Sequence, residues 1–270
     1  MRPRQWPKNL LVFASLIFAA EYDEPGKWGA AFAAFVAYCA ASSAAYLLND
    51  VLDAEEDRRH PLKRNRPVAS GALSPERALA AAALLAIAAV AIMAWFGWQS
   101  IAYIGGFMAL QAAYSLRLKQ LVLIDVMAIA ALFVIRAAAG AEAVDVRISP
   151  WLIVCTALLA LFLALAKRRG ELVSTAANEG GRSVLDGYSF ALVDQLVSIV
   201  AYSLYTFEAR EGSAMMATIP FVVFGLFRYL MLMHREDLGE EPENVLLTDV
   251  PILATIALWA LTSALILGFT

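Results

Sequence analysis

The most chemically distinctive residues of this chain form an acidic run at Asn49, Asp50, Asp53 and Asp57. If the run is helical, Asn49, Asp53 and Asp57 lie one turn apart on one face, with Asp50 one step around. Their oxygens are hard ligands of the kind that Mg²⁺ takes in proteins, where the ion keeps waters and binds substrate phosphates. The spacing therefore predicts a magnesium site built from all four residues.

Cationic side chains follow the acidic run directly, at Arg58, Lys63 and Arg66. Carboxylates that hold Mg²⁺ beside Lys and Arg are typical of a polyphosphate site, because negative charge on the phosphate is then neutralised from two sides. The alternative is a solvated loop in which acidic and basic side chains simply cancel. Carboxylates at the end of an apolar span are costly, which favours the functional interpretation.

The elements that must position these residues are membrane helices. Of 270 residues, 61% are hydrophobic and 17% charged, whereas soluble domains average about 45–50% and about 25%. Mean hydropathy is +0.66. This composition excludes disordered, collagen-like, coiled-coil and disulfide-scaffold classes. The net charge of −3 indicates no nucleic-acid partner, and Cys39 and Cys155 lack the spacing of a zinc site.

Apolar segments near the spanning length of about 17–25 residues predict an all-α, polytopic bundle of nine transmembrane helices, forming one domain over residues 1–270. The first segment is the weakest and is expected to be short or tilted. The third and fourth are joined so tightly, through Gly97, that they predict a helical hairpin. The nine segments cover 9–20, 28–48, 76–96, 98–115, 121–140, 150–166, 189–207, 214–233 and 250–269.

The distribution of positive charge predicts the orientation of the bundle. Most of the 21 Lys and Arg residues fall in alternate connections, and only Lys27, Arg147 and Arg210 fall in the opposite ones. Loops rich in Lys and Arg face the cytoplasm. We therefore expect the N-terminus, the long connections and the candidate site on the cytoplasmic face, with the C-terminus outside.

The acidic run, with His60-Pro61-x-Lys63-Arg64-x-Arg66-Pro67 after it, resembles the first aspartate-rich motif of the UbiA superfamily of intramembrane prenyltransferases. Further segments are similar to one branch, the polyprenyl-phosphate phosphoribosyltransferases, and keep that branch's order over almost the whole chain. These segments are Arg2-Pro3-Arg4-Gln5-Trp6-x-Lys8-Asn9, Ile135-Arg136-Ala137 with Ala139-Gly140, Ala166-Lys167-Arg168 with Glu171-Leu172, and Gly239 with Glu241-Pro242-Glu243.

This resemblance implies transfer of 5-phosphoribose from phosphoribosyl diphosphate (PRPP) to a polyprenyl phosphate such as decaprenyl phosphate, releasing diphosphate and feeding the synthesis of cell-envelope arabinose or ribose donors. It implies Mg²⁺ as cofactor, a bacterial inner membrane, and association of several copies, as a trimer. Asp50, Asp53 and Asp57 would act with Lys63 and Arg66 on the leaving diphosphate. The acceptor is already anionic, so no side chain need deprotonate it, and direct attack predicts inversion at C1.

Conventional UbiA enzymes carry a second Asp-x-x-x-Asp motif after the sixth span, where this chain has Lys167-Arg168-Arg169-Gly170-Glu171. Cations in place of carboxylates suit a substrate with an additional phosphate, such as PRPP. Polar residues at the inner ends of spans complete the candidate substrate-binding set, although headgroup contacts or an interfacial position would also explain several of them. The full set is Lys8, Asn49, Arg58, Tyr114, Lys119, Asp125, Lys167, Arg168, Glu171 and Tyr188.

Two arginines, Arg136 and Arg228, fall within predicted spans. Arg136 is three turns from Asp125, about 16 Å along a helix, so the two cannot pair. We expect Arg136 to snorkel toward the outer surface and Arg228 to face the site cavity.

Two other functions stay open. A conventional UbiA enzyme, which moves a prenyl group from a prenyl diphosphate to an aromatic or other small acceptor, shares the fold and the first motif but has the second acidic pair. A transporter would place its polar residues near the midplane, with broken helices in related halves. Here the charges gather at one face, which favours an enzyme.

Overall fold

Every regular element in the described part of the chain is a helix, and the chain divides into two compact units. Unit 1 comprises Met1–Ala128 with Leu132–Ile148, and unit 2 comprises Ile129–Ala131 with Ser149–Thr270. The computed structural model describes residues 3–19, 23–59, 63–121, 124–179, 199–203, 205–206, 213–235 and 248–269.

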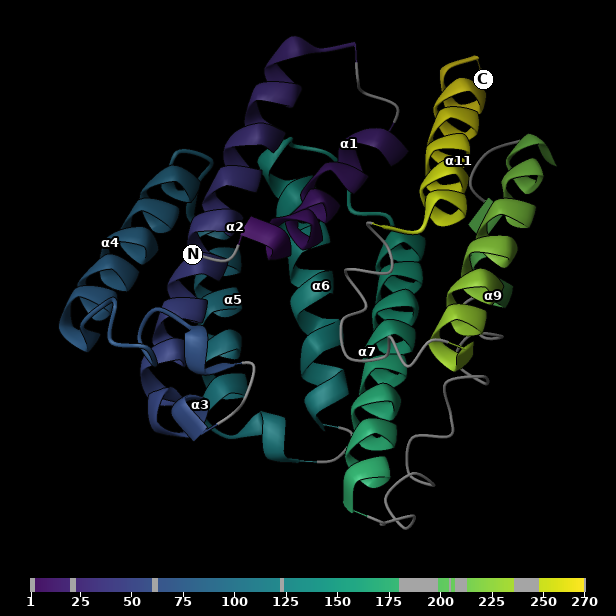
Figure 1. Ribbon diagram of the computed structural model, residues 1–270. Coiled ribbons are helices and arrows are strands. Elements are labelled where there is room, and N and C mark those ends of the chain that lie inside the picture. Colours follow the sequence, from purple (N-terminus) through teal and green to yellow (C-terminus); the bar gives the residue numbers. More distant parts are fainter. Residues whose placement is uncertain are drawn as a thin grey trace. The chain divides into compact units, whose positions relative to one another are not determined.

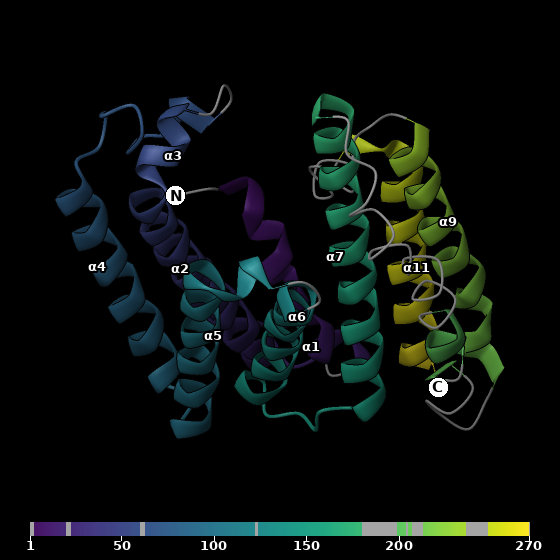
Figure 2. The same cartoon turned by 90° about the horizontal axis from the view of Figure 1, so that it is seen from below.

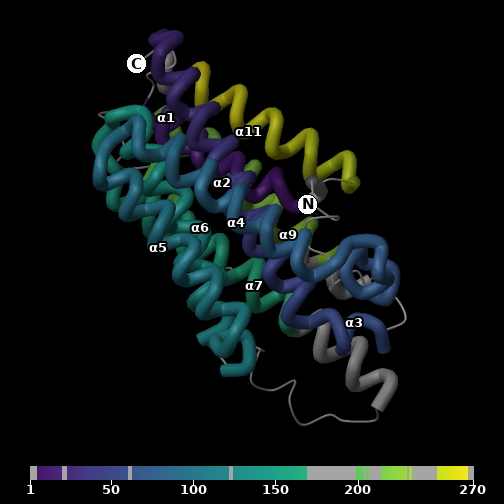
Figure 3. Tube along the Cα trace, turned by 90° about the vertical axis from the view of Figure 1, so that its left-hand side faces the viewer, coloured from purple at the N-terminus to yellow at the C-terminus, as the bar shows by residue number. Residues whose placement is uncertain are grey.

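Unit 1 is built around one long helix, α2. Figures 1 and 3 show α4 running side by side with α2, and α5 and the N-terminal segment also pack against it. The short helix α3 lies at the C-terminal end of α2 (Figure 3). The elements are η1 (Pro3–Phe13), α1 (Ala14–Phe18), α2 (Pro25–Leu52), α3 (Ala54–Arg59), η2 (Lys63–Asn65), α4 (Pro75–Ala94), α5 (Trp98–Leu116), η3 (Leu118–Gln120) and α6 (Ile124–Ala143).

Small side chains on α2 allow its neighbours to approach closely, as is common between membrane helices. Ala34, Ala37 and Ala41 are fully or almost fully buried on one face of α2. Among them Tyr38 packs edge-on against Phe107 of α5, with ring centroids 5.0 Å apart. This core fixes α2, and with it the acidic run at its end.

The turn between α4 and α5 has the form expected from the sequence. Pro75 opens α4, and the Ser74 hydroxyl caps it by accepting a hydrogen bond from the Arg77 backbone N–H at 3.4 Å. At the other end Gly97 adopts φ +110°, a conformation that other residues rarely reach. The predicted hairpin is confirmed.

The N-terminal segment differs from the expected helix over residues 9–20. It begins at Pro3 as a 3₁₀-helix and becomes α-helical only for Ala14–Phe18. Tertiary contacts explain the difference. A Cβ built on Gly140 of α6 would lie 2.1 Å from the Val12 carbonyl oxygen, so the two backbones touch where no other residue fits. The Ser15 hydroxyl also donates to the Ala137 carbonyl at 3.0 Å.

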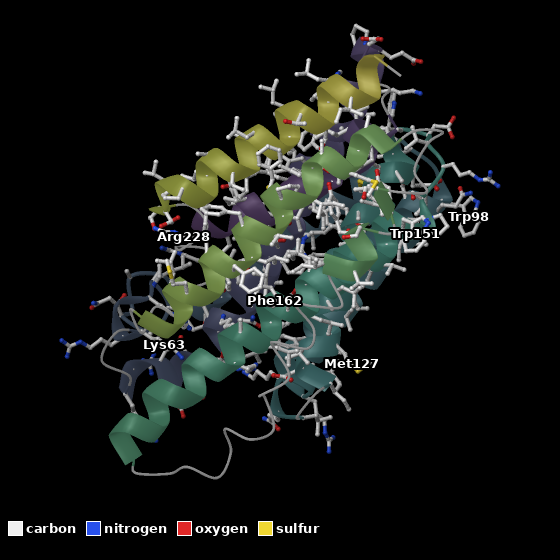
Figure 4. The ribbon with its side chains drawn as sticks, turned by 90° about the vertical axis from the view of Figure 1, so that its right-hand side faces the viewer. Lys63, Trp98, Met127, Trp151, Phe162 and Arg228 are labelled. Carbon is white, nitrogen blue, oxygen red and sulfur yellow. The ribbon has the colours of Figure 1, made fainter. Side chains whose placement is uncertain are left out.

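Unit 2 contains α7 (Pro150–Glu179), η5 (Ser213–Thr218), α9 (Ile219–Arg235) and α11 (Val250–Phe269). Within it, α9 and α11 run side by side (Figure 2). Phe162 of α7 packs edge-on against Tyr229 of α9, with centroids 5.7 Å apart (Figure 4). The sixth predicted span, 150–166, matches the apolar part of α7, Pro150–Arg168, and the helix continues beyond this part to Glu179.

Four of the described helices are long and apolar enough to cross a membrane, and two shorter apolar helices lie in unit 2. The seventh predicted span, 189–207, falls largely outside the described residues. The four are Pro25–Leu52, Pro75–Ala94, Ile124–Ala143 and Pro150–Arg168, and the shorter two are Ala214–Tyr229 and Val250–Ile266.

Replacing Gly140 by alanine is expected to destabilise unit 1, because the added methyl group meets the Val12 backbone, which cannot move aside as a side chain can. Overpacking of this kind costs about 1–3 kcal/mol. Gly106→Ala on α5 is the matched control, since nothing lies within 4 Å of its Cβ position. Thermal unfolding of the purified variants should show a lower midpoint for Gly140→Ala only; equal midpoints would contradict the close approach.

Candidate functional site

The acidic run keeps helical spacing although α2 ends at Leu52. The Asp53 N–H donates to the Asn49 carbonyl at 2.9 Å, and the Asp57 N–H donates to the Asp53 carbonyl at 2.8 Å. These i to i−4 bonds carry the helical path from α2 into α3. The predicted helical stacking of the run is therefore confirmed at the level of the backbone.

Arg66 joins two carboxylates of the run. Its Nη1 lies 2.6 Å from Asp57 Oδ2 and 3.8 Å from Asp50 Oδ1. Residues seven apart on a helix nearly coincide in direction, which explains why Asp50 and Asp57 reach the same guanidinium. The side chains of Asp50 and Asp57 are 8% and 4% exposed, and that of Arg66 is 26% exposed. A largely buried acidic pair is thus neutralised by a partly exposed cation.

Asp53 has a different counter-ion. Its Oδ1 accepts a hydrogen bond from Lys119 Nζ at 3.2 Å, and both side chains are about one-third exposed. Lys119 lies in η3, just beyond α5, so this bond connects two parts of unit 1 that are 66 residues apart in the sequence. The carboxylates of the run therefore form two groups, one paired with Arg66 and one with Lys119. Both cations were predicted from the sequence to belong to the site.

The segment after α3 is folded back and packed, unlike a solvated loop. Arg58 Nε donates to the Ala69 carbonyl at 3.1 Å. Val68 is 1% exposed and packs against Ala54 and Ala78. Lys63 is exposed (Figure 4). Arg58 therefore braces the segment that carries Arg66, while Lys63 extends from it.

The chemistry of these donors suits Mg²⁺. Asn49 Oδ1 is buried and has no hydrogen-bond partner among the described residues, which leaves a hard oxygen in the same helical run as Asp50 and Asp53. Within the described residues no three acidic, His or Cys side chains converge on a point where a metal ion would sit. The residue types fit, and the carboxylates are held instead by Arg66 and Lys119.

Other predicted site residues of unit 1 lie at helix ends. Tyr114 is half-buried in the last turn of α5, and Lys8 is half-buried in η1. Asp125 is 2% exposed in the first turn of α6, where its Oδ1 accepts a hydrogen bond from the Val126 N–H at 2.7 Å. All three make polar or electrostatic interactions.

In unit 2, Lys167 and Arg168 are half-buried on α7 and also have partners. The backbone of Glu171 belongs to α7, one turn further on. The segment that follows the sixth span is therefore helical at these three residues. Tyr188 lies outside the described residues.

The two arginines within spans have different surroundings. Arg136 does not snorkel, because it is 6% exposed and donates from Nε to Asn9 Oδ1 at 2.8 Å. Sequence reasoning gave Asn9 no role, although it stands in the N-terminal motif.

Arg228 of α9 makes two hydrogen bonds to Asp249, of 3.3 and 2.9 Å (its position is labelled in Figure 4). Asp249 also caps α11 through the Ile252 N–H at 2.9 Å. The Arg228 guanidinium holds the pKa of Asp249 below its usual value. This pair stabilises unit 2, and the orientation of Arg228 toward the site cavity stays a prediction.

Residues 10–250 match the model of the UbiA prenyltransferase family. The chain belongs to this family. It is 34% identical to decaprenyl-phosphate phosphoribosyltransferase of Mycolicibacterium smegmatis, over 92% of this chain and 85% of that protein. It is 32% identical to the protein of the same name from Corynebacterium glutamicum, over 96% of this chain and 82% of the relative.

Solved UbiA structures share the fold at lower sequence identity. A UbiA homolog from Archaeoglobus fulgidus bound to GPP and Mg²⁺ superimposes with a TM-score of 0.72 at 17% identity, covering 100% of this chain and 98% of that chain. The family match and the apolar helices together make this UbiA protein a multi-pass membrane transferase.

Neutralising Arg66 in this UbiA protein is expected to lower stability, because Asp57 then stays buried without its closest cation. Leaving a buried charged group unpaired costs about 1–3 kcal/mol or more. Arg64→Gln is the control for Arg66→Gln, because Arg64 is exposed and lies two residues earlier in the chain, in η2. Denaturant unfolding monitored by circular dichroism should show a lower midpoint for Arg66→Gln alone. A midpoint equal to that of Arg64→Gln would show that the ion pair contributes nothing.

Proposed function

We propose that this chain transfers 5-phosphoribose from PRPP to a polyprenyl phosphate, such as decaprenyl phosphate, and releases diphosphate. The observation that carries the proposal is the similarity, over more than nine-tenths of the chain, to relatives named decaprenyl-phosphate phosphoribosyltransferase. Those relatives are matched over more than four-fifths of their own length, so the likeness extends over most of the protein. The product would serve the synthesis of cell-envelope pentose donors.

The charges of unit 1 suit the leaving diphosphate. Mg²⁺, when bound by Asn49, Asp50, Asp53 and Asp57, would neutralise charge on the diphosphate oxygens as a Lewis acid. Arg66 and Lys119 lie against these carboxylates, so both can donate to the same phosphate groups. Lys63 and Arg58 add positive charge on the segment that follows.

The acceptor needs no general base, because a polyprenyl phosphate is already an anion. The work of the protein is then to bring the phosphate oxygen to C1 of ribose and to hold the departing diphosphate. The C1–O bond to diphosphate breaks as the new C1–O bond forms. Attack from the opposite face inverts the configuration at C1.

The remaining candidate residues would bind the other groups of the two substrates. Lys167 and Arg168 are assigned to the 5-phosphate of PRPP, because cations there suit a phosphate held directly by the protein. Glu171 completes the substrate-binding set on the same helix. Tyr188 would donate to a ribose or phosphate oxygen. Lys8, Tyr114 and Asp125 complete the set in unit 1.

We further propose that the two units form one domain of nine spans in a bacterial inner membrane. The excess of Lys and Arg in alternate connections supports a cytoplasmic N-terminus and site, with the C-terminus outside. A cytoplasmic site would meet water-soluble PRPP and a lipid phosphate at the same surface. Association into a trimer is part of the same proposal.

A second candidate is prenyl transfer from a prenyl diphosphate to an aromatic or other small acceptor. It is supported by the family and by the similar fold of a protein bound to GPP and Mg²⁺. Both reactions release diphosphate, and they differ in the group that is transferred.

Purified protein in lipid nanodiscs, given Mg²⁺, decaprenyl phosphate and PRPP labelled in the ribose, should form a labelled lipid. The anomeric configuration of this product, determined by NMR, should be inverted relative to PRPP. Turnover of geranyl diphosphate with an aromatic acceptor, and no labelled lipid from PRPP, would replace the proposal with prenyl transfer. Retained configuration would refute direct attack.

Asp53→Asn should lower turnover about 100-fold or more, because it removes a charged metal ligand, and should raise the Mg²⁺ concentration needed for half-maximal rate. Glu56→Gln is the matched control, because Glu56 is exposed on α3 and its replacement removes one negative charge close to Asp53 in the sequence. Chelation of Mg²⁺ by EDTA should abolish turnover in both. An Asp53→Asn variant with full rate and an unchanged Mg²⁺ requirement would refute the metal role.

A further inference from the structure

Arg136 is a charged residue that the proposed function does not use. It lies seven residues before the end of α6, and within the described residues its guanidinium pairs with no carboxylate. Besides the bond to Asn9, Nη1 donates to the Leu132 carbonyl at 2.9 Å, and Cζ lies 4.6 Å from the Phe107 ring centroid. Burying a guanidinium among neutral groups is costly, so these contacts indicate a role that a neutral side chain would not fill.

The partner of Arg136 is itself fully buried and joins three elements. Asn9 Nδ2 donates to Cys39 Sγ at 3.3 Å, and the Ser42 hydroxyl donates to Asn9 Oδ1 at 3.4 Å. Asn9 lies in η1, Cys39 and Ser42 lie in α2, and Arg136 lies in α6. One amide group therefore fixes the N-terminal segment between two helices of unit 1.

The direction of the N-terminal segment follows from its contacts along α2. Trp6 Nε1 donates to Ser43 Oγ at 3.4 Å, whereas Asn9 bonds the earlier residue Cys39. The segment is therefore antiparallel to α2, and its beginning points toward the acidic run. Figure 2 shows the purple segment beside α2.

Because Trp6 contacts Ser43 and Asn9 contacts Ser42, the backbone of Lys8 lies at the level of this part of α2. Asn49 is seven residues further along α2 than Ser42, which is on the order of 10 Å along the helix axis. A lysine side chain and a bound diphosphate together can bridge that distance. A shift of the segment by one residue would turn Lys8 to another side of the 3₁₀-helix.

We propose that Arg136 is a positioning residue: by holding Asn9, it sets the register of the N-terminal segment against α2 and presents Lys8 to phosphate groups at the acidic run. The inference rests on the proposed role of Lys8 and deepens it. Arg136 touches no substrate in this scheme. Its effect on binding is transmitted entirely through Asn9 and the segment.

A double-mutant cycle tests this transmission. The dissociation constant of inorganic diphosphate with Mg²⁺ is measured from the rise in the unfolding midpoint of the full chain in nanodiscs. Lys8→Ala and Arg136→Gln should each weaken binding about 10-fold, the effect of losing one charge-assisted hydrogen bond. Together they should weaken it by no more than about twofold beyond Lys8→Ala, because the lysine is already displaced.

Arg228→Gln is the matched control, because it also removes a span arginine but acts in unit 2 through Asp249. In the double variant with Lys8→Ala, the fold-changes in the dissociation constant of diphosphate caused by the two substitutions should multiply. The proposal would be overturned if Arg136→Gln or Lys8→Ala left the affinity for diphosphate unchanged. A roughly 100-fold loss of affinity in the variant that combines Lys8→Ala with Arg136→Gln would also overturn it.

A second pair of variants keeps the arginine in place. Asn9→Asp retains the oxygen that accepts from Arg136 and should bind diphosphate within about threefold of the unchanged protein, whereas Asn9→Leu, of similar size, should match Arg136→Gln. If Arg136→Gln does not fold, this pair decides, and equal affinities would refute the positioning role. The diphosphate readout is independent of which group is transferred. If the double-mutant cycle shows the expected coupling but PRPP yields no labelled lipid, the proposed function is refuted and the positioning role of Arg136 is not.

Discussion

The hydrogen bond between Arg136 and Asn9 joins residues 127 positions apart, and the interior of unit 1 is arranged around it. A guanidinium in an apolar bundle must be surrounded by acceptors and π faces, or its desolvation would unfold the region. Leu132 supplies a carbonyl and Phe107 supplies a ring face, while alanines on α2 leave room for the segment that brings Asn9. This part of the core thus provides hydrogen-bond acceptors and a ring face for one buried charge.

The charges of the acidic run are satisfied in another way, and the difference bears on function. Arg66 and Lys119 are about one-quarter and one-third exposed and pair with carboxylates, whereas Arg136 is 6% exposed and pairs with neutral groups. Partly hydrated ion pairs can exchange partners at modest free-energy cost, because water and ligands reach them. A guanidinium enclosed by protein, such as that of Arg136, cannot exchange partners in this way. The first arrangement suits binding, and the second suits fixed support.

Local patterns in the sequence were sufficient for features that depend on local physics. The helical spacing of the acidic run, the hairpin at Gly97 and the all-helical architecture follow from periodicity, turn chemistry and hydropathy. The burial of Arg136 could not be predicted in this way, because its position near one end of a span fits snorkelling equally well. Arg136 stays buried because it donates a hydrogen bond to Asn9, which is distant in sequence. The close approach of η1 to Gly140 likewise joins residues that are distant in sequence.

The length of α7 shows a related limit. Lys167 and Arg168 end the apolar pattern, and hydropathy places a boundary there, although both residues favour helix. Hydropathy predicts where a membrane ends, which need not be where a helix ends. The counter-ions of the acidic run show the same limit, since only the fold brings Lys119 to Asp53.

The contacts of the N-terminal segment also constrain the order of events during biosynthesis. Trp6 and Asn9 can meet α2 early, but the partners at Arg136, Ala137 and Gly140 emerge from the ribosome about 130 residues later. At about 5–20 residues per second, that delay is on the order of 10 s. During this interval Asn9 lacks its α6 partner, so the first residues to be translated are among the last in unit 1 to reach their final positions.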